Sequence, residues 1–290
     1  MKTLARLGLA AALVTTTALP AFAQSDEPFR IGWTAWSDAE FVTKLAERII
    51  TDELGHEVEL IQTDIAPQYL GLQEGDIDAM LMAWLPTTHA DYWAEVQDDV
   101  VQLGVLYTDA KLGWVVPSYV PEDEVASIAD LADPDVRERF GGTIQGIDPG
   151  AGLMRLSEQT IEAYGLDYDL ITASGAAMTA ALDEAIRRNE WIVVTGWSPH
   201  WMFGAYDLRY LDDPMGTLGG AESIYALGRQ GVQEDFPEIS AFLMRLNLPL
   251  DELEAAMFDA QQTSYEEAVD HYIEQHPDRI RYWVTGESEG

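Results

Sequence analysis

The chain has 290 residues, no cysteine, and 51 acidic against 16 basic residues, so its formal net charge is −35. This charge argues against nucleic acid as a partner, and the lack of cysteine excludes disulfides, thiolate metal sites and a lipidated cysteine. The acidity could attract cationic solutes. Because the acids are spread along the chain and salt screens them beyond about 8 to 10 Å, we interpret it mainly as a solubility feature.

The first 23 residues have the order of a cleavable secretory signal. Lys2 and Arg6 precede an apolar run over 7–19, and the small-residue site Pro20–Ala23 follows. A membrane anchor would need roughly 20 continuous apolar residues, and this run is shorter. We expect 1–23 to be a signal peptide and the mature protein to be a free periplasmic protein that begins at Gln24, with a charge of about −37.

The remaining length suits two lobes better than a single core. In the first segment, strand and helix patterns alternate, and the first helix gathers Phe41, Val42, Leu45 and Ile49 on one face. The expected elements are a strand over 29–33, a helix over 39–54, a strand over 58–61, a helix over 66–73 and a strand over 77–84. This alternation predicts a parallel α/β sheet.

The apolar, β-rich stretch Lys111–Pro117 predicts a crossover into a second lobe that repeats the alternation. There we expect strands over 143–147, 171–173 and 191–195, and helices over 152–164 and 176–189. A return crossover near 219–227 leads to helices over 234–246, 250–262 and 265–276. The predicted fold is therefore α/β with two lobes, lobe I over 24–115 plus 217–290 and lobe II over 116–216.

Two segments, Met82–His89 and Val194–Trp201, each run an apolar strand into a Trp-x-Pro turn. In open α/β sheets ligands lie at the carboxyl ends of strands, so Trp84 and Trp197 are expected to face the cleft between lobes, and Trp36 follows the first strand in the same way. A single Trp is more often a packing residue. Three at strand ends favour a box of indoles around a methylated cation, which cannot donate a hydrogen bond.

The segment Gly146–Met154 places an Asp-Pro turn and two glycines directly before a helix, whose free N–H groups favour an anion. It lacks the third glycine of a dinucleotide fingerprint, and an ordinary turn and cap remains the alternative. Asp148 is expected to serve the turn. His89 lies five residues after Trp84 and can donate to a carboxylate, whereas His200 is expected to be a turn or supporting residue.

A pocket with an aromatic end and an anion-binding end suits a zwitterion such as a betaine. The histidines have no metal-ligand spacing, and no nucleophile is followed by an evident base. We therefore predict a binding protein with no catalytic residues, cofactor or metal. The alternatives are a binding protein for choline, carnitine or trimethylamine oxide, and an enzyme acting on betaines, for which only His89 offers acid–base chemistry.

Several segments together resemble the glycine betaine/proline betaine substrate-binding proteins of ABC transporters, the OpuAC type. The resemblance extends over essentially all of the mature sequence. The segments that carry it are Thr34–Trp36, Ala83–His89, Lys111–Tyr119, Gly146–Gly152, Gly175–Thr179, Val193–Phe203 and Tyr210–Pro214.

This resemblance implies a periplasmic-binding-protein fold of type II that closes around its ligand and delivers it to membrane permease subunits, with the protein acting as a monomer. It also implies that Trp36, Trp84 and Trp197 form a cage and that His89 binds the carboxylate. The family's paired backbone amides fall on Gly152 and Leu153, where many relatives have Ile or Val instead of Leu. Trp33 and Trp201 have no cage role in the family pattern and are expected to pack. The ligand could be glycine betaine, proline betaine or dimethylsulfoniopropionate.

Overall fold

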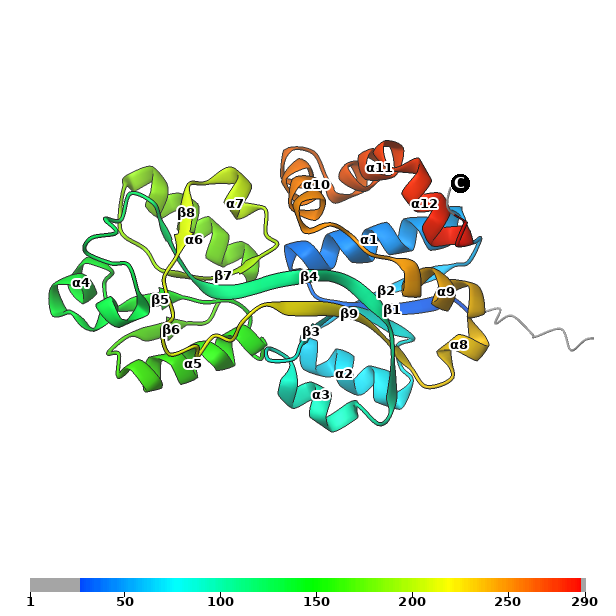
Figure 1. Ribbon diagram of the computed structural model, residues 1–290, viewed down its shortest axis with the longest axis horizontal. Coiled ribbons are helices and arrows are strands. Elements are labelled where there is room, and N and C mark those ends of the chain that lie inside the picture. The colour runs from blue at the N-terminus through cyan, green and yellow to red at the C-terminus, as the bar shows by residue number, and fades with distance from the viewer. Residues whose placement is uncertain (1–26, 288–290) are drawn as a thin grey trace, which may run out of the picture.

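A computed structural model describes residues 27–287, and the predicted signal segment 1–23 lies outside the described residues. The described chain forms one mixed sheet in the order β2-β1-β3-β9-β4-β7-β5-β6, with β8 paired to β4 (Figure 1). The strands are β1 (Phe29–Trp33), β2 (Val58–Gln62), β3 (Ala79–Leu85), β4 (Val100–Pro117), β5 (Thr143–Gln145), β6 (Asp169–Ile171), β7 (Val194–Ser198), β8 (Leu208–Tyr210) and β9 (Glu222–Arg229).

Helices gather around the two ends of this sheet and make two lobes (Figure 1). We call the part built on β1, β2, β3 and β9 the first lobe. Its helices are α1 (Ser37–Asp52), α2 (Ile65–Glu74), α3 (Ala90–Val96), α8 (Val232–Asp235), α9 (Pro237–Arg245), α10 (Leu250–Gln262), α11 (Tyr265–Gln275) and α12 (Pro277–Thr285). The part built on β5, β6 and β7 is the second lobe. Its helices are η1 (Ile128–Ala132, a 3-10 helix), α4 (Pro134–Arg139), α5 (Gly152–Tyr164), α6 (Gly175–Arg188) and α7 (Met202–Ala205).

The strands that follow the strand–helix alternation are parallel in each lobe, as predicted. β1 pairs in parallel with β2 and β3, and β5 pairs in parallel with β6 and β7. Every residue of β3 is buried, which matches its continuous apolar sequence and a sheet covered on both faces. Parallel pairing brings the carboxyl ends of β1 and β3 to the same edge of the sheet, where Trp36 and Trp84 lie.

The long strand β4 passes through both lobes. Over 100–110 it pairs antiparallel with β9, and over 111–115 it pairs antiparallel with β7. The predicted crossovers near 111–117 and 219–227 are thus strands of the sheet. The start predicted from the apolar run Lys111–Pro117 was eleven residues too late. The stretch from Val100 contains Gly104 and Asp109, and its pairing with β9 shifts register three times.

Three predicted elements need correction. The strand expected over 171–173 lies at β6, over 169–171, and the strand expected over 191–195 begins only at Val194. Trp191 lies outside it, with the Arg139 guanidinium 3.7 Å from its ring centroid. The helix expected over 234–246 is divided into α8 and α9, with Pro237 at the start of α9. A proline is well placed in the first turn of a helix and poorly placed in its interior.

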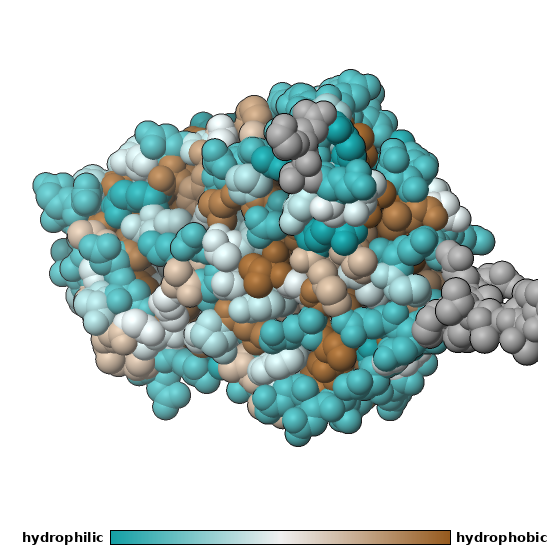
Figure 2. Space-filling model, turned by 45° about the vertical axis from the view of Figure 1, so that its right-hand side comes forward, coloured by the Kyte–Doolittle hydropathy of each residue, from teal (hydrophilic) through white to brown (hydrophobic). Residues whose placement is uncertain are grey.

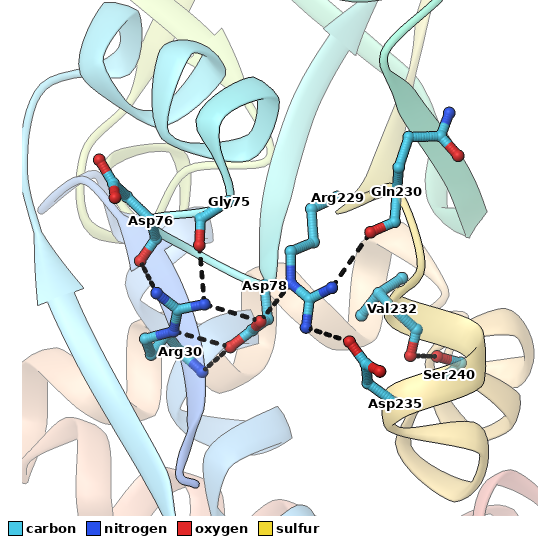
Figure 3. Close-up of polar contacts among 9 residues, drawn as sticks. All are labelled: Arg30, Gly75, Asp76, Asp78, Arg229, Gln230, Val232, Asp235 and Ser240. Carbon is cyan, nitrogen blue, oxygen red and sulfur yellow. Dashed lines mark hydrogen bonds and ion pairs between the residues drawn. The ribbon is translucent and has the colours of Figure 1, made fainter. Parts of the chain in front are cut away.

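An ion cluster fastens the first lobe next to the start of β3 (Figure 3). The buried Asp78 carboxylate precedes β3 and accepts from Arg30 Nη2 at 3.0 Å and from Arg229 Nε at 2.6 Å. Arg229 also donates to Asp235 at 2.7 Å. Because Arg30 lies on β1 and Arg229 ends β9, a single paired carboxylate ties three neighbouring strands together.

The visible surface is mainly hydrophilic with scattered apolar areas, as expected from the acidic composition (Figure 2). None of the helices within residues 27–287 is long and apolar enough to cross a membrane.

Candidate functional site

The two Trp-x-Pro segments end β3 and β7, and both have a cis peptide bond before the proline, at Leu85-Pro86 and Ser198-Pro199. Trp84 and Trp197 are therefore carried by equivalent turns in the two lobes. Trp36 lies between β1 and α1. All three indoles are buried, with 3 to 7% of their surface exposed.

These three indoles line one pocket between the lobes. All six residues expected at the ligand contribute to its wall. The lining residues are Trp36, Trp84, Thr88, His89, Leu112, Ile147, Ala151, Gly152, Leu153 and Trp197. Four of these residues were not predicted individually: Thr88, Leu112, Ile147 and Ala151. All four lie inside sequence segments that were predicted to be important, and this position in a motif was the available signal.

The indole N–H groups of two of the tryptophans are already bonded. Trp36 Nε1 donates to Asp148 Oδ2 at 2.9 Å, and Trp197 Nε1 donates to Asp38 Oδ1 at 3.0 Å. The rings of Trp36 and Trp197 lie 6.5 Å apart, tilted by 59°. With their N–H groups occupied, these side chains offer the pocket aromatic ring surface, which attracts cations.

His89 is held by its neighbour in the same turn. The backbone N–H of Trp84 donates to His89 Nδ1 at 3.1 Å, and the backbone N–H of His89 donates to the Trp84 carbonyl at 3.0 Å. An imidazole that accepts at Nδ1 carries its proton at Nε2. Among the described residues His89 Nε2 has no hydrogen-bond partner, although the side chain is buried. The wall of the pocket therefore contains an N–H donor that is free to bind a ligand.

The imidazole of His89 is neutral. Burial, together with the smaller effect of the positive charge of Arg155, lowers its pKa to about 3. A neutral donor keeps its Nε2 proton across the whole physiological pH range.

The start of α5 supplies further donors. Gly152 and Leu153 are its first two residues, and no side chain caps this end, which is preceded by Ala151. The first backbone N–H groups of a helix have no partner within the helix and favour an anion. Gly152 must lack a side chain here, because a Cβ would collide with the Thr88 carbonyl oxygen of the facing lobe.

The turn that carries Thr88 and His89 is fixed from both lobes. The Glu222 carboxylate accepts the backbone N–H groups of Thr87 and Thr88 at 2.9 and 3.0 Å. Arg155 on α5 donates to the carbonyl oxygens of the same two residues at 3.3 and 3.2 Å. Sequence reasoning missed Glu222 and Arg155, because each lies more than sixty residues from this turn and neither belongs to a recognisable motif.

Two further expectations concern the turns. Asp148 belongs to the turn before α5, where its carbonyl accepts from Ala151 at 3.2 Å, and its side chain bonds Trp36 as well. His200 lies edge-on to Trp197, 4.5 Å between ring centroids, and accepts the backbone N–H of Met202. Neither side chain lines the pocket, so both support it from behind.

Within residues 27–287 no group of three or more His, Cys, Asp or Glu side chains is placed to hold a metal ion. The pocket wall contains His89 and Thr88 as its polar side chains, and the rest is aromatic, aliphatic or glycine. This composition suits recognition of a small solute by shape, ring faces and a few directed donors.

A pocket enclosed between two α/β lobes and lined from strand ends of both is the arrangement of a periplasmic-type solute-binding protein. Residues 27–275 match the family model OpuAC, described as the substrate binding domain of an ABC-type glycine betaine transport system. The match covers most of the chain, and the chain belongs to this family.

Individual relatives agree with this assignment. Over 159 residues the chain is 39% identical to the glycine betaine/carnitine transport binding protein GbuC of Listeria monocytogenes, and the matched region spans 53% of either protein, about half of that relative's length. The closed-liganded crystal structure of lactococcal OpuAC with glycine betaine is 37% identical with a TM-score of 0.83, covering 89% of this chain and 100% of that one. The glycine betaine/L-proline-binding protein ProX of Borrelia burgdorferi is 30% identical with a TM-score of 0.83, covering 89% and 97%. The predicted two-lobed α/β fold is confirmed.

Proposed function

We propose that this protein captures glycine betaine, or a closely related methylated zwitterion such as proline betaine or dimethylsulfoniopropionate, and delivers it to the permease subunits of an ABC importer. The observation that carries the proposal is a pocket lined by three indoles and by the imidazole of His89, whose Nε2 has no hydrogen-bond partner among the described residues. The ligand is bound and delivered unchanged, as expected of a member of a substrate-binding family.

The cation lies among Trp36, Trp84 and Trp197. A quaternary ammonium or sulfonium group has no N–H to donate and a diffuse charge, so each ring face attracts it by about 0.5 to 2 kcal/mol when water is excluded. The burial of all three indoles provides that exclusion.

The carboxylate lies at the opposite end, where His89 Nε2 and the backbone N–H groups of Gly152 and Leu153 donate to it. These donors are uncharged, so the ligand's anion is bound by directed hydrogen bonds rather than by a counter-ion. Their geometry also selects against ligands without an acceptor in this place.

The site joins residues of both lobes, which supports capture by closure of the lobes around a hinge. We place the boundaries at 24–115 plus 217–290 for lobe I and 116–216 for lobe II, with the hinge in the segments that cross between them. The N-terminal segment 1–23 fits a secretory signal, and we place the mature protein in the periplasm as a monomer.

A ligand panel tests this function. Isothermal titration calorimetry on residues 24–290 should give tight binding of glycine betaine. Choline should bind at least about tenfold more weakly, because it has no carboxylate to accept charge-assisted hydrogen bonds worth about 1.5 to 3 kcal/mol. Carnitine, trimethylamine oxide, proline betaine and dimethylsulfoniopropionate complete the panel. Equal affinities for choline and glycine betaine would contradict the two-ended pocket. Recovery of altered ligand after long incubation would favour an enzyme instead.

A further inference from the structure

The indole N–H bonds of the pocket cross from one lobe to the other in a reciprocal pattern. Trp36 of the first lobe donates to Asp148 of the second, and Trp197 of the second lobe donates to Asp38 of the first. The bonded residues are 112 and 159 positions apart in sequence. Both bonds form only when the lobes are together, so the rings of Trp36 and Trp197 are fixed in place by closure itself.

Asp38 is an unusual partner because it is a buried carboxylate without a counter-ion among the described residues. It lies in the first turn of α1 with none of its surface exposed. Its oxygens accept from Trp197 Nε1 and from Tyr107 OH, the latter at 2.6 Å. Within residues 27–287 no Lys, Arg or His forms an ion pair with it.

A buried ionised carboxylate is costly unless a positive charge or enough donors offset the loss of water. Burial raises the pKa of Asp38, and hydrogen bonds from Tyr107, from Trp197 and from the backbone N–H groups of Asp38 and Ala39 oppose that rise. In the proposed complex the ligand's cation lies against the ring of Trp197 and brings a positive charge close to Asp38. A cation there would stabilise the carboxylate behind the indole, and the carboxylate would stabilise the cation in front of it.

We propose that Asp38 and Asp148 are positioning residues for the ligand's cation, each orienting a cage tryptophan of the opposite lobe and supplying negative charge behind its ring. This inference rests on the proposed function. Acceptance of the N–H by a carboxylate makes the ring face more negative, and in a dry site that charge acts over a greater distance than in water. The effect of Asp38 should exceed that of Asp148, because Asp148 is only half-buried.

The test compares two ligands of equal shape that differ in charge. Glycine betaine carries a quaternary nitrogen where tert-butylacetate carries a neutral quaternary carbon, and both have the same carboxylate. Asp38→Asn keeps an oxygen that can accept from Trp197 Nε1 but removes the charge. The measured quantity is the affinity for glycine betaine divided by the affinity for tert-butylacetate, both determined by calorimetry. We expect this ratio to fall about tenfold in Asp38→Asn and about threefold in Asp148→Asn. Asp98→Asn, which removes an exposed charge away from the pocket, should leave it unchanged.

A merely structural role gives a different pattern. If Asp38→Asn weakened both ligands equally, the inference would be overturned and the proposed function would stand. If the unaltered protein failed to bind glycine betaine, the proposed function itself would fall. Should Asp38→Asn not fold, as judged by circular dichroism, Asp148→Asn decides the question by the same ratio.

Trp197→Phe provides a second, independent readout. It keeps an aromatic face but has no N–H to donate to Asp38. If Asp38 acts through the indole, combining Asp38→Asn with Trp197→Phe should cost less glycine betaine affinity than the product of the two single losses. A combined loss of affinity equal to the product of the two single losses would contradict a role of Asp38 through Trp197.

Discussion

Replacing Trp84 with alanine is expected to weaken glycine betaine binding by about a hundredfold or more, while the protein remains folded. Trp84 is 3% exposed at the end of β3 and forms part of the pocket wall. Its removal takes away one ring face and opens the pocket to water, which weakens the attraction of the remaining indoles for the cation. Trp197→Ala should have an effect of similar size, because it removes a ring and also the donor to Asp38.

Calorimetry with glycine betaine checks this result, and far-ultraviolet circular dichroism with thermal unfolding shows whether the variants are folded. Trp84→Phe is the matched control, since it keeps a smaller aromatic face and should lose only part of the affinity. Unaltered affinity in a folded Trp84→Ala or Trp197→Ala variant would show that the indole concerned only packs.

Replacing His89 with alanine is expected to weaken carboxylate ligands by about 10- to 100-fold and to change choline affinity little. The loss arises because a buried side-chain donor without a partner among the described residues disappears from the pocket wall, and choline has no carboxylate to bind it. The relevant measurement is the ratio of glycine betaine to choline affinity, so a general loss of folding does not imitate the result. His89→Gln, which can accept from Trp84 and still donate, should recover part of the discrimination.

The same residue predicts how binding depends on pH. Burial holds the pKa of His89 at about 3, below the usual value of 6.5, so the folded protein keeps a neutral imidazole as pH falls from about 8 to about 5. The contribution of His89 to affinity should be flat over this range in the unaltered protein. An affinity that rises steeply below about pH 6.5 would show instead that a charged imidazole binds the carboxylate, contradicting the neutral-donor account.

Much of the fold follows from local pattern. The helix around Phe41 and Leu45 and the apolar strand before Trp84 were predicted from the pattern of their apolar residues. Both are present close to their predicted bounds, and these apolar residues are buried. The long strand β4 was not predicted in full, because its first half pairs with β9 across more than a hundred residues and its own sequence has little alternation. Non-local pairing of this kind leaves a weak local signal.

The candidate pocket shows the same division. Trp84, His89 and Trp197 could be predicted from sequence because each sits in a short motif at a strand end. Asp38 could not, because an Asp in the first turn of a helix is ordinary on local grounds. Its significance comes from Trp197, which folding brings to it from the opposite lobe.

The most direct test of the two-ended pocket is a crystal structure of the mature protein with glycine betaine. We expect the trimethylammonium group to lie among the rings of Trp36, Trp84 and Trp197. We also expect a carboxylate oxygen within hydrogen-bonding distance of His89 Nε2 and of the backbone N–H groups at the start of α5. A ligand bound in the reverse direction, or one whose carboxylate is held by Arg155 outside the pocket, would contradict the two-ended pocket.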